Sequence, residues 1–289
     1  MANLKWNVGN IEIFPLAELE IGGVIQYLVY EATPDAIKPM DGLVPDFADE
    51  EGNLRACTQA FLIKSGDKLV LVDACVGNDK VRENFQPLSN LKTDFLKLIH
   101  DLDVKETDVD YVVFTHLDLD HIGWSTSLKQ DKWEPTFPNA KYIYVKGEYD
   151  YWKNDPENEM KDYKDAFADS VEPVMNAGLG LLVDNDYKLD DNISLLPTKG
   201  HTLNHVSISI ESNGEKAIIT GDLIHHPCQF IRPDWSTHAD RSVEEAVACR
   251  AKLLSDIADK NILLIGSHFA APAAGYVTKA GDSYRFKPL

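Results

Sequence analysis

The chain has 289 residues, of which 44% are hydrophobic and 26% are charged, the ordinary balance of a soluble globular protein with a substantial core. Its 28 basic and 47 acidic residues give a formal net charge of −19 at pH 7, which disfavours nucleic acid and membrane surfaces as partners. The four cysteines lack a Cys-x-x-Cys spacing and the N-terminus lacks an apolar signal-like run. Neither a zinc ribbon nor a dense disulfide framework is therefore indicated, and we expect a cytoplasmic protein.

The N-terminal part of the chain is predicted to form strands and one long loop. Residues 9–31 are predicted to be extended segments separated by a Gly-Gly pair. The stretch 32–53, rich in Pro, Asp and Gly, is predicted to be a loop long enough to have a function. Apolar runs at 56–64 and 68–73 flank a turn that contains Gly66, which predicts a β-hairpin.

The rest of the chain alternates helices and strands. Apolar residues recur at intervals of three and four over 88–102, which predicts an amphipathic helix. Residues 110–115 are predicted to be a buried strand that ends at a histidine, and residues 149–180 a helical insertion. A helix is expected at 243–258, and further strands at 193–197, 206–211, 216–220 and 262–266.

Four residues of metal-binding type directly follow the strand predicted at 110–115. They are His116, Asp118, Asp120 and His121. Because side chains alternate along an extended segment, the first three can turn to one side, and the last can join them where the backbone bends. Imidazole and carboxylate groups suit zinc, iron or manganese. A solvated polar loop is the alternative interpretation of this segment.

Three more residues of metal-binding type each follow a predicted strand. They are His201, Asp222 and His268, and each stands beside a glycine. Glycine lets the backbone bend or approach closely where a side chain would obstruct it. Together with the first segment they make seven candidate ligands, enough for two metal ions with room for water.

In this order, the motif His116-x-Asp118-x-Asp120-His121, with Gly-His201-Thr, Gly-Asp222 and His268, resembles the metallo-β-lactamase superfamily of binuclear hydrolases. The resemblance covers most of the chain, from Val72-Asp73-Ala-Cys75-Val-Gly77 to Tyr284-Arg285. The segment Glu148-Tyr-Asp-Tyr-Trp152 and the sequence after Asp222 are similar to the branch that includes N-acyl homoserine lactonases and methyl parathion hydrolase.

This resemblance implies a single domain over residues 1–289. Its fold class would be α/β, a four-layer αββα sandwich of the metallo-β-lactamase type with two similar halves. Residues 32–53 would be an N-terminal loop extension of that domain, and residues 149–180 an insertion in it.

The resemblance also implies a role for each candidate ligand. His116 and His201 would hold the first of two divalent metal ions, expected to be zinc. Asp120, His121 and His268 would hold the second ion, and Asp222 would bridge the two. Asp73 would support the ligand loops by hydrogen bonding; its other interpretation is a simple carboxylate at the end of a strand.

Asp118 departs from the usual motif of the superfamily, His-x-His-x-Asp-His, because it stands where the second histidine would be. A carboxylate can still bind a metal, but it is a harder ligand, which shifts the preference from zinc toward iron or manganese or weakens the first site. The flavodiiron branch also has a carboxylate at this place, so a di-iron redox enzyme is an alternative. That branch carries a flavodoxin domain, for which this chain has no length left.

The predicted function is a metal-dependent hydrolase. A metal-bound hydroxide would attack a small ester or lactone, with an N-acyl homoserine lactone as the best single candidate by resemblance. Asp120 would be the catalytic residue, which orients the hydroxide or passes a proton to the leaving group. The alternatives are a phosphotriesterase or thioesterase using the same centre, and a binding protein with a degraded site.

Three other histidines lie close to the predicted ligands in the sequence. His205 is either a support for the site or a structural residue, and His225 and His226 are expected to line the pocket rather than to bind a metal. The expected partner is a small-molecule substrate, and the loop and insertion are segments of a kind that favours a homodimer.

Overall fold

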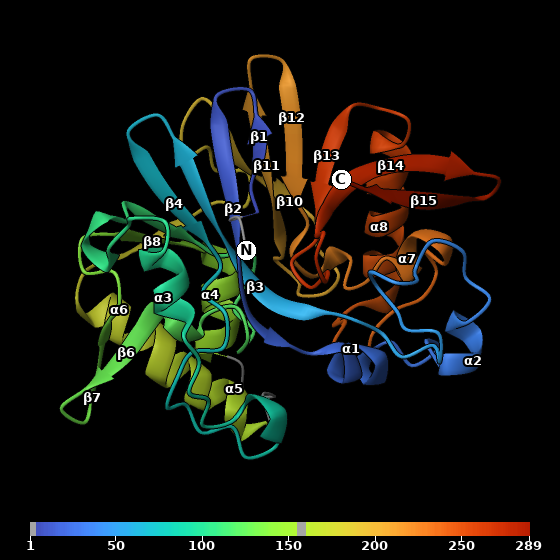
Figure 1. Cartoon of the computed structure of the whole chain (residues 1–289). Coiled ribbons are helices and arrows are strands. Elements are labelled where there is room, and N and C mark those ends of the chain that lie inside the picture. The colour runs from blue at the N-terminus through green and yellow to red at the C-terminus, as the bar shows by residue number, and fades with distance from the viewer. Residues whose placement is uncertain (1–3, 155–159) are drawn as a thin grey trace. The chain divides into compact units, whose positions relative to one another are not determined.

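The computed structural model describes residues 4–154 and 160–289. The chain divides into two compact units (Figure 1). Unit 1 comprises Met1–Leu19 and Thr58–Asp184, and unit 2 comprises Glu20–Cys57 and Asn185–Leu289. Each unit is built on one large β-sheet accompanied by helices, so the predicted α/β fold class is confirmed.

The sheet of unit 1 has seven strands in the order β1-β2-β3-β4-β5-β8-β9. The predicted hairpin is present, with β3 and β4 antiparallel and Phe61 opposite Val72. The strands β4, β5, β8 and β9 are parallel to one another. The bounds are β1 Trp6–Val8, β2 Ile11–Glu20, β3 Cys57–Ser65, β4 Lys68–Val72, β5 Tyr111–Val113, β8 Lys141–Val145 and β9 Gly180–Val183.

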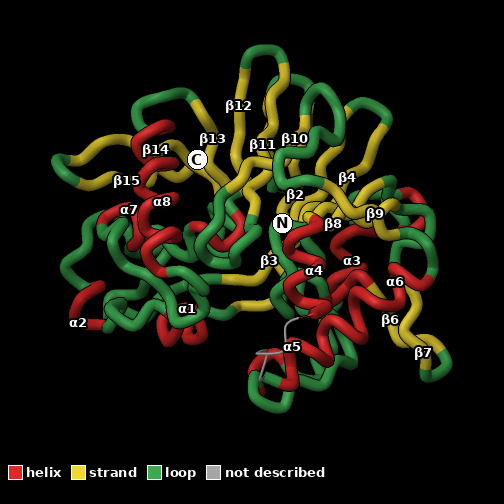
Figure 2. Tube along the Cα trace, turned by 180° about the vertical axis from the view of Figure 1, so that it is seen from behind, coloured by secondary structure: helices red, strands yellow, loops and turns green. Residues whose placement is uncertain are grey.

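Helices α3 and α4 lie beside the strands of this sheet in both views (Figures 1 and 2). The segment predicted as an insertion is mainly helical as far as Asn176, and its last residues lead into β9; its residues 155–159 lie outside the described residues. The bounds are η1 Gln86–Leu88, α3 Phe95–His100, η2 Glu106–Asp108, η3 Gly123–Ser125, β6 Thr126–Lys129, β7 Lys132–Pro135, α4 Lys146–Asn154, α5 Lys161–Ala166, the π-helix η4 Phe167–Val171 and α6 Glu172–Asn176.

The helix predicted over 88–102 is shorter in the structure. Only Phe95–His100 is α-helical, because Asn90 has a φ of 52°, which a right-handed helix does not allow. The backbone N–H of Asn90 instead donates to the carbonyl of Lys80. The helix predicted from the apolar spacing is therefore confirmed over Phe95–His100 and wrong for the residues before Phe95.

The sheet of unit 2 has six strands in the order β10-β11-β12-β13-β14-β15, and helix α8 lies beside it (Figure 1). The strands and the long helix predicted after residue 192 are confirmed within one residue or two. The bounds are α1 Gly22–Leu28, α2 Pro34–Ile37, β10 Ile193–Pro197, β11 Val206–Ser212, β12 Glu215–Ile219, η5 Gly221–Leu223, α7 Cys228–Ile231, α8 Val243–Ile257, β13 Ile262–Ile265, β14 Ala274–Ala280 and β15 Ser283–Pro288.

The extended structure predicted for 9–31 is correct only as far as Glu20, because Gly22–Leu28 forms helix α1. A Cβ atom at Gly22 would lie 2.0 Å from the carbonyl oxygen of Leu54. Gly22 therefore permits a close approach of two backbone segments at the start of a helix, and the glycine pair does not form a turn between strands.

Parallel strand pairs bring the candidate ligands of each unit to one edge of its sheet. In unit 1, Val72 at the end of β4 lies opposite Val113 in β5, so Asp73 and the residues after Phe114 emerge together. In unit 2, Ile219 in β12 lies opposite Ile265 in β13, so Asp222 and His268 follow neighbouring strand ends. The carboxyl ends of such strands are where open α/β sheets place their chemistry.

None of the helices within residues 4–154 and 160–289 combines the length and the apolar character that crossing a bilayer requires.

A buried ion cluster connects the loop after β4 to the helical segment of unit 1. The guanidinium of Arg82 donates to both carboxylate oxygens of Asp169, at 2.8 and 3.0 Å. The ammonium of Lys80 lies 3.2 Å from the same carboxylate and donates to Thr126 at 2.9 Å. Both cationic side chains are completely buried. Burial lowers the pKa of Lys80 to about 8, although the Asp169 carboxylate opposes this shift.

This pKa predicts a pH-dependent contribution of Lys80 to stability. Between pH 8 and about 10.5 the unfolded chain binds this proton and the folded protein does not, so the unfolding free energy rises with pH. Relative to that of Lys80→Met, the unfolding free energy of the wild type should rise by about 2 kcal/mol between pH 8 and pH 10, as measured by denaturant unfolding. Lys97→Met, at an exposed lysine, is the control. A difference that does not change with pH would contradict the expectation.

Candidate metal centre

The ligand segment of unit 1 follows β5 and packs against the turn after β4. The backbone N–H of Ala74 donates to the carbonyl of His121 at 2.6 Å, and that of Gly123 donates to the carbonyl of Cys75 at 2.7 Å. A Cβ atom at Gly123 would lie 1.7 Å from the carbonyl oxygen of Val76. Only glycine permits this approach, so the end of the ligand segment is fixed by backbone contacts.

Asp73 holds this segment through three groups. Its carboxylate accepts from the backbone N–H of Thr115 at 2.8 Å, from the Thr115 hydroxyl at 2.9 Å and from Nδ1 of His121 at 3.0 Å. Because the Thr115 hydroxyl gives its proton to Asp73, its oxygen accepts from Nδ1 of His116, 3.0 Å away. The predicted support of the ligand loop by Asp73 is thus confirmed. Both imidazoles carry their proton on Nδ1 and present a lone pair at Nε2.

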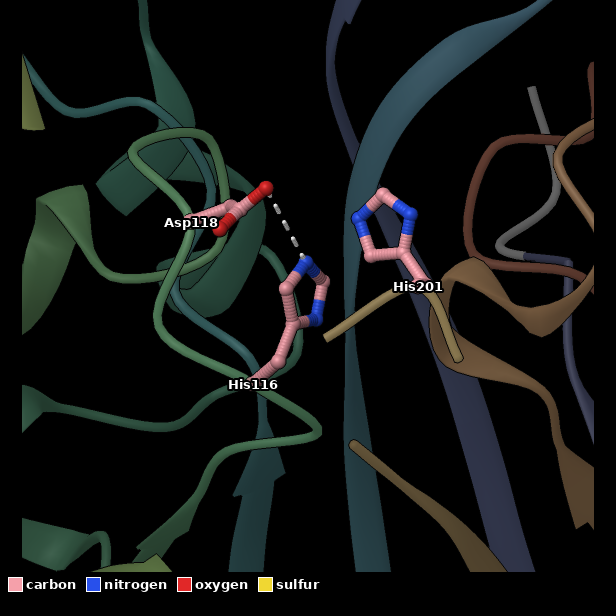
Figure 3. Close-up of side chains that lie close together, drawn as sticks. All are labelled: His116, Asp118 and His201. Carbon is pink, nitrogen blue, oxygen red and sulfur yellow. Dashed lines mark ion pairs between the residues drawn. The ribbon is translucent and has the colours of Figure 1, made fainter. Parts of the chain in front are cut away.

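The two carboxylates of the segment lie beside these Nε2 atoms. Figure 3 shows the His116 ring turned toward Asp118, with 3.8 Å between Nε2 and Oδ2. Nε2 of His121 lies 3.8 Å from Oδ2 of Asp120. The Asp120 side chain is 19% exposed, whereas those of His116 and His121 are buried. Of the two carboxylates in this segment, that of Asp120 is therefore the more accessible to solvent.

Unit 2 contributes a second group of donors around Asp222. Oδ2 of Asp222 lies 3.5 Å from Nε2 of His201, and Oδ1 lies 3.1 Å from Nε2 of His268. His201, which Figure 3 also draws, comes from the loop after β10, and His268 follows β13. Each of the three residues is buried.

The imidazoles of unit 2 are oriented in the same way as those of unit 1. Nδ1 of His201 donates to the Asp240 carboxylate at 3.0 Å, and Nδ1 of His268 lies 3.2 Å from the backbone carbonyl of Cys57. Burial disfavours the charged form of Asp240, but the hydrogen bonds that its carboxylate accepts from Nδ1 of His201 and from the backbone N–H of Thr237 prevail and hold its pKa at about 2. Asp240 is therefore ionised at neutral pH, and His201 presents Nε2 as a lone pair.

The other three histidines near these donors differ in how their ring nitrogens are used. In His205, Nδ1 lies 3.0 Å from the carbonyl of Thr198, and Nε2 accepts from the backbone N–H of Asp222 at 2.9 Å. In His226, Nε2 donates to the carbonyl of Phe47 and Nδ1 accepts from the N–H of Cys228. Both rings are therefore structural. His225 lies with Nε2 3.2 Å from Oδ2 of Asp222, and burial lowers its pKa.

Sequence reasoning missed three partners of the ligands. Asp240 lies 39 residues from His201, and the Cys57 carbonyl lies 211 residues from the His268 it contacts. Glu148 is buried and accepts from the backbone N–H of Leu117, between two ligands, and from the indole of Trp152. No local motif marks the first two; Glu148 stands in a segment already singled out by resemblance, but its contact could not be foreseen.

The donor set fits divalent cations. Four imidazoles present Nε2 lone pairs, and each faces a carboxylate oxygen at 3.1 to 3.8 Å. Two such groups repel each other unless a cation lies near both, and imidazole with carboxylate is the ligand set of zinc, iron and manganese. A partner on Nδ1 is the usual support of a histidine that binds a metal through Nε2.

The model of the metallo-beta-lactamase superfamily matches residues 58–268. This match spans most of the chain, so the protein belongs to the metallo-beta-lactamase superfamily. The expected enzyme class, a metal-dependent hydrolase, is thereby confirmed, and the two groups of histidine and aspartate support binding of divalent metal ions. A comparison with curated protein sequences gives no match.

Several solved structures are similar to this chain over nearly its whole length. AidC, a dizinc quorum-quenching lactonase in complex with a product, is 22% identical with a TM-score of 0.80 and covers 99% of this chain and 97% of its own. AbOPH, a hydrolase of the beta-lactamase superfamily, is 21% identical with a TM-score of 0.79 and the same coverage. An N-acyl homoserine lactone hydrolase is 17% identical with a TM-score of 0.61, and covers 91% of this chain and 94% of its own.

The contact between Asp240 and His201 predicts the effect of Asp240→Asn. Loss of the charged partner should weaken zinc binding by about 10- to 100-fold, because an amide stabilises the Nδ1 proton less and so reduces the basicity of Nε2. Competition with a chromophoric chelator measures this change. Asp234→Asn, at an exposed carboxylate paired with Arg232, is the matched control. Equal zinc affinity in wild type and Asp240→Asn would refute this role.

Proposed function

We propose that the protein hydrolyses small neutral esters at a centre of two divalent cations, with an N-acyl homoserine lactone as the first substrate to test. The observation that carries this proposal is the common orientation of four buried imidazoles, each with Nδ1 bonded to the protein and Nε2 beside a carboxylate. The lactonases among the similar structures support the choice of substrate.

The two donor groups would serve one centre, as membership in the superfamily favours. His116, Asp118 and His201 would hold the first ion, and Asp120, His121 and His268 the second. Asp222 would contribute to both, since its carboxylate lies beside Nε2 of His201, at 3.5 Å, and beside Nε2 of His268, at 3.1 Å. When bound, such cations lower the pKa of water toward neutrality and polarise a carbonyl oxygen.

Residues of the chain would orient the imidazoles and transfer the proton. Asp73 and Asp240 stay buried and keep the imidazole protons on Nδ1. Asp120, the most exposed of the acidic donors, would accept a proton from the attacking water at its carboxylate and return it to the leaving oxygen as the acyl carbon–oxygen bond breaks. The net charge of −19 favours a neutral substrate over an anionic one.

Removal of metal tests the proposal directly. Protein stripped with a chelator should lose lactone hydrolysis, by at least about 100-fold, and recover it with Zn, Mn or Fe(II), since the cations supply most of the charge stabilisation. Rates on a lactone panel and on paraoxon-type esters, measured side by side, separate lactonase from phosphotriesterase. Hydrolysis that is indifferent to chelators would refute the metal-dependent mechanism.

Asp118 permits a second test, by metal content. We expect about two ions per chain in wild type purified without added metal. Asp118→His should retain two and shift the preference toward zinc over manganese by about 10-fold, because imidazole is the softer ligand. Elemental analysis and chelator competition measure both quantities. One ion or none in wild type, rising to two in Asp118→His, would show that Asp118 does not bind a metal.

Iron with visible absorption in the isolated protein would favour the di-iron redox alternative.

A further inference from the structure

His225 is a buried histidine of unit 2 whose ring is not used by the fold. Its side chain is 1% exposed, Nδ1 has no hydrogen-bond partner among residues 4–154 and 160–289, and Nε2 faces only the carboxylate of Asp222. The neighbouring His205 and His226, which are equally buried, have both ring nitrogens hydrogen-bonded. A buried polar group without a partner destabilises the folded protein, so the position of His225 requires another explanation.

The ring faces the same carboxylate oxygen as a predicted ligand. Nε2 of His225 is 3.2 Å from Oδ2 of Asp222, and Nε2 of His201 is 3.5 Å from that oxygen. Donor atoms of the three residues all lie within 4.8 Å of one another. Two ligands of a tetrahedral zinc ion, each at 2.0–2.1 Å, are separated by about 3.3 Å. The spacing around Asp222 thus matches the edges of a metal coordination shell.

The backbone of His225 is held firmly in this place. Its N–H donates to the side-chain oxygen of Gln229 at 2.8 Å, and the amide nitrogen of Gln229 donates to the carbonyl of Trp235 at 3.0 Å. Gln229 is completely buried. The ring is therefore presented to Asp222 by a fixed turn.

We propose that His225 is a further metal ligand, whose Nε2 binds the same cation as His201 and Asp222. The assignment rests on the proposed function, which supplies the cation. The resulting first site has three ligands from unit 2 alone.

The test is metal affinity in His225→Gln and His225→Ala. Zinc retention at one of the two sites should fall by more than about 100-fold, beyond the 10- to 100-fold cost of losing only the partner of a ligand. The visible spectrum of the cobalt-loaded protein should change at the same time, because one nitrogen donor is lost. His100→Gln, at an exposed histidine outside the ligand groups, is the control and should bind as wild type does.

Unchanged affinity and an unchanged cobalt spectrum in both variants would overturn the assignment and leave the proposed function intact. Wild-type protein that binds no divalent cation would overturn the proposed function and this assignment with it. If the variants do not fold, a crystal structure of the zinc-loaded wild type decides: we expect zinc at about 2.1 Å from Nε2 of His225. A separation greater than about 3 Å would overturn the assignment.

Discussion

The position of one proton on each buried imidazole is the constraint on which the site depends. In His121 and His201 a carboxylate takes the Nδ1 hydrogen, in His116 a hydroxyl oxygen does so, and in His268 a backbone carbonyl. Each partner fixes both the tautomer and the rotation of the ring, so four lone pairs point where the fold directs them. Replacing any of these partners would therefore change the tautomer or the orientation of the imidazole that it contacts.

The topology of each sheet explains how residues distant in sequence come to lie at one edge of it. Strands β4 and β5 are parallel, as are β12 and β13, so the polar residues that follow each pair emerge at one edge. Antiparallel neighbours would send them to opposite edges. Gly123 then allows the ligand segment to contact the preceding turn, so backbone packing fixes the end of this segment.

Four of the six strands of unit 2, the hairpin and the long helix could be predicted from the sequence, because each follows from local periodicity or local composition; β14 and β15 were not predicted. The start of the helix predicted at 88 was wrong, because Asn90 has a left-handed backbone conformation. The extended structure predicted after Gly22 was also wrong, because the backbone at Gly22 closely approaches Leu54 at the start of a helix. Asp240 and the Cys57 carbonyl could not be predicted, because only the folded chain brings them to their histidines.

The sequence separations of these contacts bear on the order in which the protein folds. His201 meets Asp240 across 39 residues and His121 meets Asp73 across 48, whereas His268 meets the Cys57 carbonyl across 211. The entropy lost on closing a loop grows with its length, and contacts distant in sequence form slowly. The contact that orients the ring of His268 therefore closes the longest loop of the three, and it can form only after nearly the whole chain has been synthesised.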